Sequence, residues 1–223
     1  MEHPHLSLEY VLRKPAVDTK EPPVLILLHG YGSNESDLFG LSTTLPPSLL
    51  VISARAPYVL SESQYAWFSL DFSTGKPVGD SKEAEQSRLL LKKFVDEVIE
   101  TFMVDRAQIF LVGFSQGAIM SGSVALTFPS LAKGIAMLSG RILPEIKSQV
   151  NDKSTLKNLH VFLAHGTEDT VLPIRHARDA REYLEEQDVD LEYAEYPIAH
   201  AISDEETRAL VMWLKRTLAV PTR

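Results

Sequence analysis

Cysteine is absent from this 223-residue sequence, and its absence excludes several kinds of chemistry. The chain can form no disulfide, no zinc site with thiolate ligands and no cysteine nucleophile. Neither an H-E-x-x-H pattern nor a cluster of carboxylates with metal-ligand spacing is present. The glycine patterns of phosphate-binding and dinucleotide-binding loops are also missing. We therefore expect no metal and no cofactor.

Basic residues and long apolar runs are scarce as well. The 30 acidic residues outnumber the 22 basic ones, and a formal net charge of -8 disfavours binding to nucleic acid and anchoring on anionic membranes. The longest purely apolar runs, such as residues 24–28, fall far short of the ~20 residues of a membrane-spanning helix. The first residues lack the basic start and apolar stretch of a signal peptide. We expect a cytoplasmic protein.

Short apolar runs alternate with amphipathic segments along the chain. Nearly continuous apolar runs, typical of parallel strands buried on both faces, occupy residues 24–28, 49–52, 109–112, 134–138 and 160–164. Two further strands are predicted at residues 6–12 and 191–196, and helices at residues 81–103, 116–128, 173–186 and 204–218. The alternation predicts an α/β fold with a mostly parallel sheet and helices on both faces. No repeat or linker divides it, so we expect one domain over residues 1–223.

Four positions mark the expected helix starts. Asp80 or Ser81 is suited to cap the first helix, and Ser203 the last. Pro173 is expected at the start of the third helix, where proline is tolerated.

A G-x-S-x-G pattern follows the central apolar run. Gly113, Ser115 and Gly117 lie between a predicted strand and a predicted helix. A sharp strand-to-helix turn exposes a serine hydroxyl, and small flanking residues allow the close packing that such a turn needs. The backbone N–H of Gln116 would then point out of a helix N-terminus, where negative charge is favoured. We interpret Ser115 as a nucleophile rather than an ordinary turn serine.

A serine nucleophile needs a histidine base and a carboxylate that orients it. In hydrolases with this turn the chain order is serine, acid, histidine, and both Asp169 and His200 follow predicted strand ends in that order. Glu168 competes with Asp169 for the role of acid, and the shorter reach of Asp169 favours it. Of the other histidines, we expect His165 to make local hydrogen bonds near the site and His176 to lie on a solvated helix face.

The second donor for a developing oxyanion should come from the loop after an early strand. Residues 24–28 run directly into His29-Gly30-Tyr31-Gly32, a loop whose glycines let backbone N–H groups converge on one oxygen. The N–H of Tyr31 is our candidate donor. The alternative is an ordinary tight turn.

Five stretches together resemble the phospholipase/carboxylesterase family of α/β-hydrolases, the acyl-protein thioesterase-like group, and most closely its bacterial esterase branch. They are LLHGYGSNESDL, APYVLSESQYAWFSLDF, LVGFSQGAIMS, AHGTEDTVLP and PIAHAIS. The resemblance spans residues 24–214. It implies an α/β-hydrolase fold without a large lid.

The resemblance also implies roles for individual residues. Ser115, Asp169 and His200 would form the catalytic triad, and the backbone N–H groups of Tyr31 and Gln116 the oxyanion hole. Trp67 matches an aromatic residue that the family places beside the substrate groove. One departure is Ala199, because the family usually has glycine before the catalytic histidine. Its methyl group would cause strain only if the backbone φ were positive.

Residues 57–77 are rich in aromatic side chains and also contain Leu60. We expect Leu60 and Phe68, with Trp67, to contact the substrate as a wall of an acyl pocket. The alternative is a surface loop that packs on itself.

The function expected from these residues is hydrolysis of carboxylic esters through an acyl-enzyme on Ser115. The alternative enzyme is an acyl thioesterase or lysophospholipase that acts on longer acyl chains. A non-catalytic ligand-binding module is a further alternative, although such modules usually lack a triad residue. The expected partner is a small ester or thioester substrate. The family resemblance also admits a homodimer.

Overall fold

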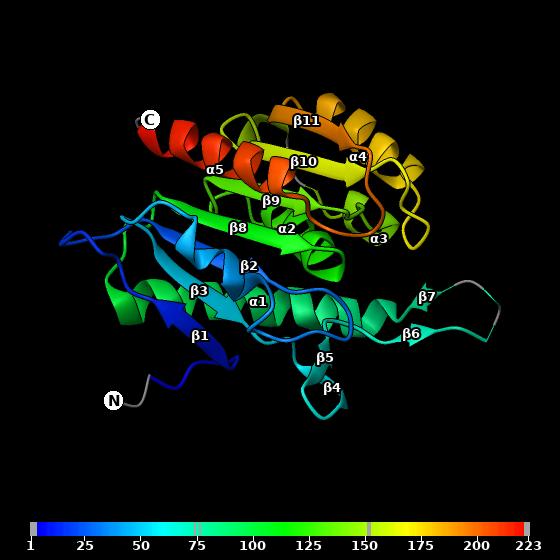
Figure 1. Cartoon of the computed structure of the whole chain (residues 1–223), viewed down its shortest axis with the longest axis horizontal. Helices are drawn as coiled ribbons and strands as arrows, with labels where there is room; N and C mark the ends of the chain where they lie inside the picture. The colour runs from blue at the N-terminus through cyan, green and yellow to red at the C-terminus, as the bar shows by residue number, and fades with distance from the viewer. Residues whose placement is uncertain (1–3, 74, 76, 151–152, 221–223) are drawn as a thin grey trace.

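A seven-stranded sheet in the order β1-β3-β2-β8-β9-β10-β11 forms the centre of the molecule (Figure 1). The structure is a computed structural model that describes residues 4–73, 75, 77–150 and 153–220. The strands are β1 (Tyr10–Arg13), β2 (Val24–Leu28), β3 (Leu50–Ala54), β8 (Ile109–Phe114), β9 (Gly134–Leu138), β10 (His160–Gly166) and β11 (Asp190–Tyr196). Strand β1 is antiparallel to β3, and the other neighbours in the sheet are parallel.

Helices cover both faces of this sheet. Helices α1 (Ser81–Phe102), α2 (Gln116–Thr127) and α4 (Arg175–Glu186) pack on one face, and η1 (Leu38–Thr43) and α5 (Asp204–Ala219) on the other. Alternate residues of each buried strand serve the two faces: in β2, Ile26 packs toward α1 and α2, whereas Leu25 and Leu27 pack toward α5 and η1. The predicted α/β fold with a mostly parallel, doubly covered sheet is confirmed.

All seven predicted strands and all four predicted helices are present, with shifts at some ends. Asp80 caps α1 by accepting hydrogen bonds from two backbone N–H groups of its first turn, and Ser203 caps α5. The first strand is shorter than expected, because only Tyr10–Arg13 pair with β3. The third helix begins at Arg175 and not at Pro173, because Pro173 lies in a preceding turn.

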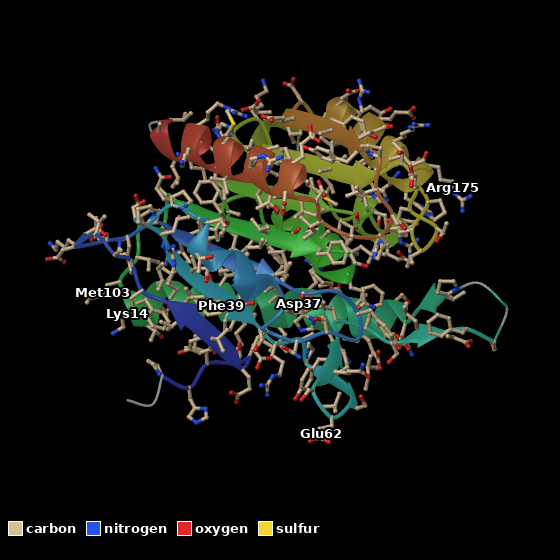
Figure 2. All side chains as sticks on the ribbon, viewed as in Figure 1. Lys14, Asp37, Phe39, Glu62, Met103 and Arg175 are labelled. Atoms are coloured by element: carbon tan, nitrogen blue, oxygen red, sulfur yellow. The ribbon has the colours of Figure 1, made fainter. Side chains whose placement is uncertain are left out.

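The segment between β3 and α1 holds two small hairpins that the sequence pattern did not reveal. They are formed by β4 (Tyr58–Ser61) with β5 (Gln64–Ala66), and by β6 (Leu70–Asp71) with β7 (Val78–Gly79). Glu62, in the turn of the first hairpin, points away from the body of the molecule (Figure 2). The second hairpin extends beyond the body at the edge toward which the parallel strands run (Figure 1). Positions 74 and 76, which belong to the aromatic-rich segment, lie outside the described residues.

The parallel strands all end at one edge of the sheet, and this edge gathers the loops that follow β2, β8, β10 and β11. Between β9 and β10 the chain forms only short described elements, α3 (Pro144–Lys147) and η2 (Lys153–Thr155). No helix in the described part of the chain has the length and apolar character needed to cross a membrane.

Helix α2 packs unusually close to the sheet, and two glycines make this possible. A β-carbon on Gly117 would lie 1.9 Å from the carbonyl oxygen of Leu28, and one on Gly113 would lie 2.1 Å from the carbonyl oxygen of Gly117. Both distances are far inside van der Waals contact, and the obstructing atoms belong to the backbone. Neither position can therefore accept a side chain without separating the helix from β2 and β8.

Replacing Gly117 by alanine should therefore destabilise the fold severely, by at least about 3 kcal/mol, or prevent folding. Gly122 in the same helix is the matched control, because its β-carbon would meet only the flexible end of Met137 at 3.0 Å. Gly122→Ala should change stability by less than about 1 kcal/mol, since alanine favours a helix. Urea denaturation followed by circular dichroism measures both, and equal effects would contradict the packing argument.

Candidate active site

Ser115 lies at a strained turn between β8 and α2. Its backbone has φ 55° and ψ −116°, a combination that non-glycine residues rarely adopt. The strain is held in place by Gly113 and Gly117, and by a hydrogen bond from the Ser115 N–H to the carbonyl of Leu138 at 2.9 Å. Strain of this kind persists only where the surrounding structure imposes it. The turn therefore presents the Ser115 side chain at the edge where the parallel strands end.

His200 and Asp169 complete a hydrogen-bonded chain with Ser115. The distance from Ser115 Oγ to His200 Nε2 is 3.0 Å, and from His200 Nδ1 to Asp169 Oδ2 it is 2.6 Å. Because an ionised carboxylate only accepts hydrogen bonds, Nδ1 of His200 carries the proton and Nε2 is left to accept from the serine hydroxyl. The structure thus brings together the three residues that the sequence singled out as nucleophile, acid and base.

The carboxylate of Asp169 is buried and fully bonded. Its Oδ1 accepts hydrogen bonds from the N–H groups of Val171 and Leu172 at 2.9 and 2.8 Å, while Oδ2 faces His200. Glu168, the competing acid, has an exposed side chain, and its backbone N–H donates to the carbonyl of Ile198. The geometry therefore places Asp169, and not Glu168, against the histidine.

Neither of the other two histidines considered from the sequence hydrogen-bonds with Ser115 in the described part of the chain. His165 is buried, and its Nε2 donates to the carbonyl of Leu172 at 2.6 Å and lies 3.3 Å from Asp169 Oδ2. Burial lowers the pKa of His165 below its usual value. His176 is half-buried on α4, where burial lowers its pKa, and the neighbouring Arg175 points away from the body (Figure 2).

The loops that carry the acid and the base are joined to each other through their backbones. Thr167 N–H donates to the carbonyl of Tyr196 at 2.8 Å. A β-carbon on Gly166 would lie 2.2 Å from the carbonyl oxygen of Ile198 and 2.5 Å from that of Ala199.

Ala199 is not among the residues with positive φ, so the methyl group that departs from the family pattern causes no backbone strain there.

The two predicted oxyanion donors lie on either side of Ser115. Tyr31 follows β2 and Gln116 opens α2, and within the described part of the chain neither backbone N–H donates a hydrogen bond. A β-carbon on Gly30 would lie 3.4 Å from Cβ of Ser115, so the loop that carries Tyr31 lies close beside Ser115. Gly32 has φ +75°, a conformation that favours glycine in this loop.

The structure corrects the expectation for Trp67 and Phe68 as substrate-contacting residues. Both side chains are buried, with 0% and 2% exposure, and neither presents a surface to a bound molecule. Leu60, on β4, is 37% exposed, so its contact with substrate stays a prediction. The aromatic side chains that are exposed beside the loop after β2 are instead Tyr31 and Phe72, whose rings lie 6.5 Å apart.

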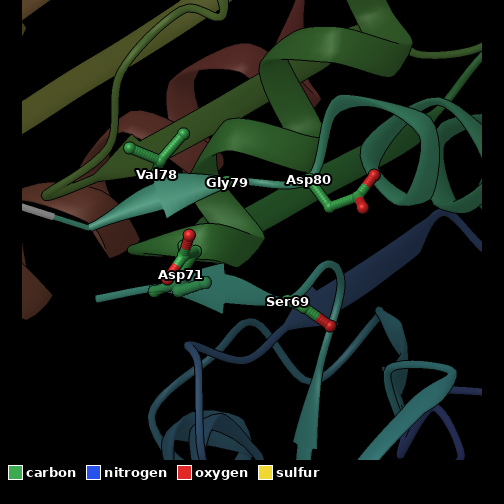
Figure 3. A pocket seen from close by; sticks show the side chains of 6 residues that line it. Ser69, Asp71, Val78, Gly79 and Asp80 are labelled. Atoms are coloured by element: carbon green, nitrogen blue, oxygen red, sulfur yellow. The ribbon is translucent and has the colours of Figure 1, made fainter. Parts of the chain in front are cut away.

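A hollow lies between β6 and β7, close to this edge (Figure 3). It is lined by Ser69, Leu70, Asp71, Val78, Gly79 and Asp80. Two of its polar groups are already engaged, because the Asp80 carboxylate caps α1 and the Ser69 N–H donates to Glu83. None of the residues proposed for chemistry lines it.

The sequence analysis did not predict that the side chain of Gln116 and the ring of His29 hold neighbouring backbone. Gln116 is 3% exposed and hydrogen-bonds with the backbone of Trp67 and Phe68, and His29 is fully buried beside Trp67. Their positions next to the glycines of the two loops were the only available signal.

Glu206 is an unusual buried acid in the first turn of α5, shortly after His200. It has no exposure, and neither carboxylate oxygen has a hydrogen-bond partner among the residues that the structure describes. Burial raises its pKa from 4.5 to about 7. The folded protein therefore keeps this proton at pH values where the unfolded chain has released it, so the stability contributed by the neutral form is lost as pH rises from about 4.5 through about 7.

Glu206→Gln, which cannot ionise, should consequently gain stability relative to the parent protein as the pH rises. The difference in unfolding free energy between variant and parent should be larger at about pH 8 than at about pH 5. Glu205→Gln, at the exposed neighbouring position, is the control and should shift stability equally at both pH values. Urea titrations at the two pH values provide the measurement, and a pH-independent difference for Glu206→Gln would contradict the assignment.

Comparison with known proteins gives consistent matches over most of the chain. Residues 15–218 match the family described as phospholipase/carboxylesterase. The esterase YpfH of Escherichia coli K12 is 29% identical over 237 residues, which cover 98% of this chain and 90% of YpfH. Acyl-protein thioesterase 1 of Kluyveromyces lactis is 28% identical over 211 residues, covering 87% of this chain and 92% of that protein. Among solved structures, the carboxylesterase of Bacillus cereus has a TM-score of 0.81 at 25% identity, covering 94% of each chain.

Proposed function

Because the chain belongs to the phospholipase/carboxylesterase family of α/β-hydrolases, we propose that it hydrolyses carboxylic esters through a covalent acyl intermediate on Ser115. The observation that carries this proposal is the unbroken hydrogen-bonded chain from Ser115 through His200 to Asp169, at 3.0 and 2.6 Å. A serine hydroxyl becomes a useful nucleophile only beside a base that is itself oriented. Each of these conditions has a named residue here.

In the proposed first step, Ser115 Oγ attacks the carbonyl carbon of the ester while His200 Nε2 takes the hydroxyl proton. The carbonyl oxygen becomes negatively charged and is stabilised by the N–H groups of Tyr31 and Gln116. When the tetrahedral intermediate collapses, the bond to the alcohol breaks, and the proton on Nε2 passes to the departing oxygen. The product is an acyl ester on Ser115.

The second step repeats this chemistry with water. His200 Nε2 takes a proton from the water that attacks the acyl carbon, and then returns it to Ser115 Oγ as the acid is released. Throughout, Asp169 holds the Nδ1–H of His200 and stabilises the imidazolium that forms in each half-reaction. The N–H groups of Val171 and Leu172 donate to its other oxygen and fix the direction of the carboxylate.

The surroundings of Ser115 favour substrates that approach from water. His200 has a side-chain exposure of 16%, and the exposed apolar groups next to the loop after β2 are few, chiefly Tyr31 and Phe72. We expect such a surface to contact the first carbons of an acyl chain. A thioesterase acting on long acyl chains is the second candidate, supported by the similarity to acyl-protein thioesterase 1.

Replacing Ser115 by alanine should lower kcat for p-nitrophenyl esters by at least about three powers of ten. Asp169→Asn should lower kcat by about four powers of ten, because the histidine then adopts the wrong tautomer. Glu168→Gln is the matched control, and it should retain nearly parental kcat because its side chain is exposed. If Glu168→Gln lost activity while Asp169→Asn stayed active, the acid would be Glu168, and the assignment of Asp169 would be wrong.

A series of p-nitrophenyl esters and acyl thioesters of increasing chain length separates the two candidate substrates. Each buried methylene adds about 0.8 kcal/mol of binding free energy. On an open surface only the first few carbons are buried, so further carbons add no binding free energy. We therefore expect kcat/KM to rise up to about butyrate and to be no greater for palmitate esters. A preference for palmitoyl thioesters would favour the thioesterase, and no turnover of any member by folded protein would favour a binding module.

A further inference from the structure

The side chain of Gln116 forms a clamp between the serine turn and residues 65–68, which we call the bridging segment. Its Oε1 accepts a hydrogen bond from the N–H of Trp67 at 2.9 Å, and its Nε2 donates to the carbonyl of Phe68 at 2.7 Å. Gln116 is 3% exposed, so both bonds are sheltered from water. The residue whose backbone N–H is a proposed oxyanion donor is therefore fixed by its own side chain.

The other end of the bridging segment is bonded to the loop that carries the second donor. The backbone carbonyl of Tyr65 accepts a hydrogen bond from the N–H of Gly32, and the backbone N–H of Tyr65 donates one to the carbonyl of Ser33, each at 2.9 Å. Gly32 is the residue directly after Tyr31. One four-residue segment thus contacts the backbone on the C-terminal side of Tyr31 and the side chain of Gln116.

His29 and the indole of Trp67 hold the same loop on the N-terminal side of Tyr31. Trp67 Nε1 donates to the carbonyl of His29 at 3.0 Å. His29 Nδ1 donates to the carbonyl of Gly30 at 2.7 Å, and His29 Nε2 accepts from the N–H of Ala56 at 3.0 Å. These partners require the neutral ring with its proton on Nδ1, and burial lowers the pKa of His29 accordingly.

Steric contacts bring the two held pieces together at the nucleophile. A β-carbon on Gly30 would lie 3.4 Å from Cβ of Ser115, and one on Gly117 would lie 2.8 Å from the carbonyl oxygen of His29. The loop after β2 therefore touches the serine turn directly. The hydrogen bonds of the bridging segment determine how the loop and the turn are oriented about this contact.

We propose that Gln116, Trp67 and His29 are positioning residues that fix the N–H groups of Tyr31 and Gln116 relative to each other, so that both aim at one oxyanion. This inference rests on the proposed function. None of the three side chains touches the reacting atoms: they act through the backbone that they hold. Trp67 would thereby act on catalysis indirectly, from within the core. This role replaces the substrate contact expected from the family resemblance.

The physical reason is that oxyanion stabilisation depends on donors that need no reorganisation when charge develops. Loss of one well-placed donor costs about 100- to 1000-fold in kcat, and misplacement by about 1 Å costs up to about 100-fold. Ground-state binding of the neutral ester depends far less on the same geometry. A positioning role therefore lowers kcat and the affinity for a transition-state analogue together, while KM changes little.

The test compares Trp67→Phe, which removes the indole N–H, with Trp213→Phe as the matched control. Trp213 is the other tryptophan of the sequence, buried on α5 against Phe110 and Phe162. Trp67→Phe should lower kcat/KM for p-nitrophenyl butyrate about tenfold and weaken inhibition by an alkylboronic acid by the same factor, with KM within about twofold of the parent. Trp213→Phe should lower the melting temperature without altering kcat/KM or inhibition.

Two substitutions of His29 give a finer test that does not depend on the large ring. Asparagine can keep the donor to the carbonyl of Gly30, whereas glutamine can keep only the acceptor for the N–H of Ala56. His29→Gln should therefore lose about tenfold more kcat/KM and boronic-acid affinity than His29→Asn, at similar melting temperatures. The pH dependence of kcat/KM should match the parent in both variants, because neither touches the triad.

The inference is overturned if Trp67→Phe and His29→Gln keep parental kcat/KM and boronic-acid affinity, whatever happens to their melting temperatures. It is also overturned if KM rises while kcat is unchanged, because that result indicates substrate binding and not donor placement. Ser115→Ala distinguishes this failure from failure of the proposed function. An active Ser115→Ala protein refutes the serine mechanism itself, whereas an inactive one leaves only the positioning role in question.

Discussion

The contact between Gly117 and the carbonyl groups at the end of β2 is the constraint on which the site depends. With a β-carbon position only 1.9 Å from the Leu28 oxygen, α2 lies as close to the sheet as a backbone can. That closeness forces the chain to reverse sharply at Ser115, which explains its positive φ. It also brings Gly30 against the serine. The strained turn at Ser115 and the position of the loop after β2 are therefore two consequences of a single packing requirement.

Close backbone-to-backbone packing at a glycine also positions the rest of the site. Gly166 allows the loop of the acid to lie against Ile198 and Ala199, immediately before the base. Close backbone packing and hydrogen bonds thus couple the loops of Asp169 and His200. A triad built from three separate loops needs such coupling, since its hydrogen bonds lie within a few tenths of an ångström of ideal lengths. Parallel strands supply the common edge, and glycines supply the close approach.

The sequence predicted the elements whose signals are local. The apolar run of β2, the serine turn and the Asp80 and Ser203 caps each depend on a few adjacent residues, and the structure has them. The hairpins of β4 to β7 were missed because their strands are two to four residues long and mostly exposed, so no alternation could develop. The start of α4 was placed too early because proline tolerates both the turn and the first helical position.

Trp67 shows why an aromatic residue near an active site is hard to interpret from sequence. A ring that packs in the core and a ring that contacts substrate have the same composition signal, and the difference lies in where the indole N–H finds a partner. Here it is satisfied by the carbonyl of His29, inside the protein. The segment expected to form a substrate wall therefore has two parts, and its buried part bonds to Gln116 and His29. The exposed side chains of the neighbourhood, Tyr31, Leu60 and Phe72, are the ones left free to contact a bound molecule, and such contact stays a prediction.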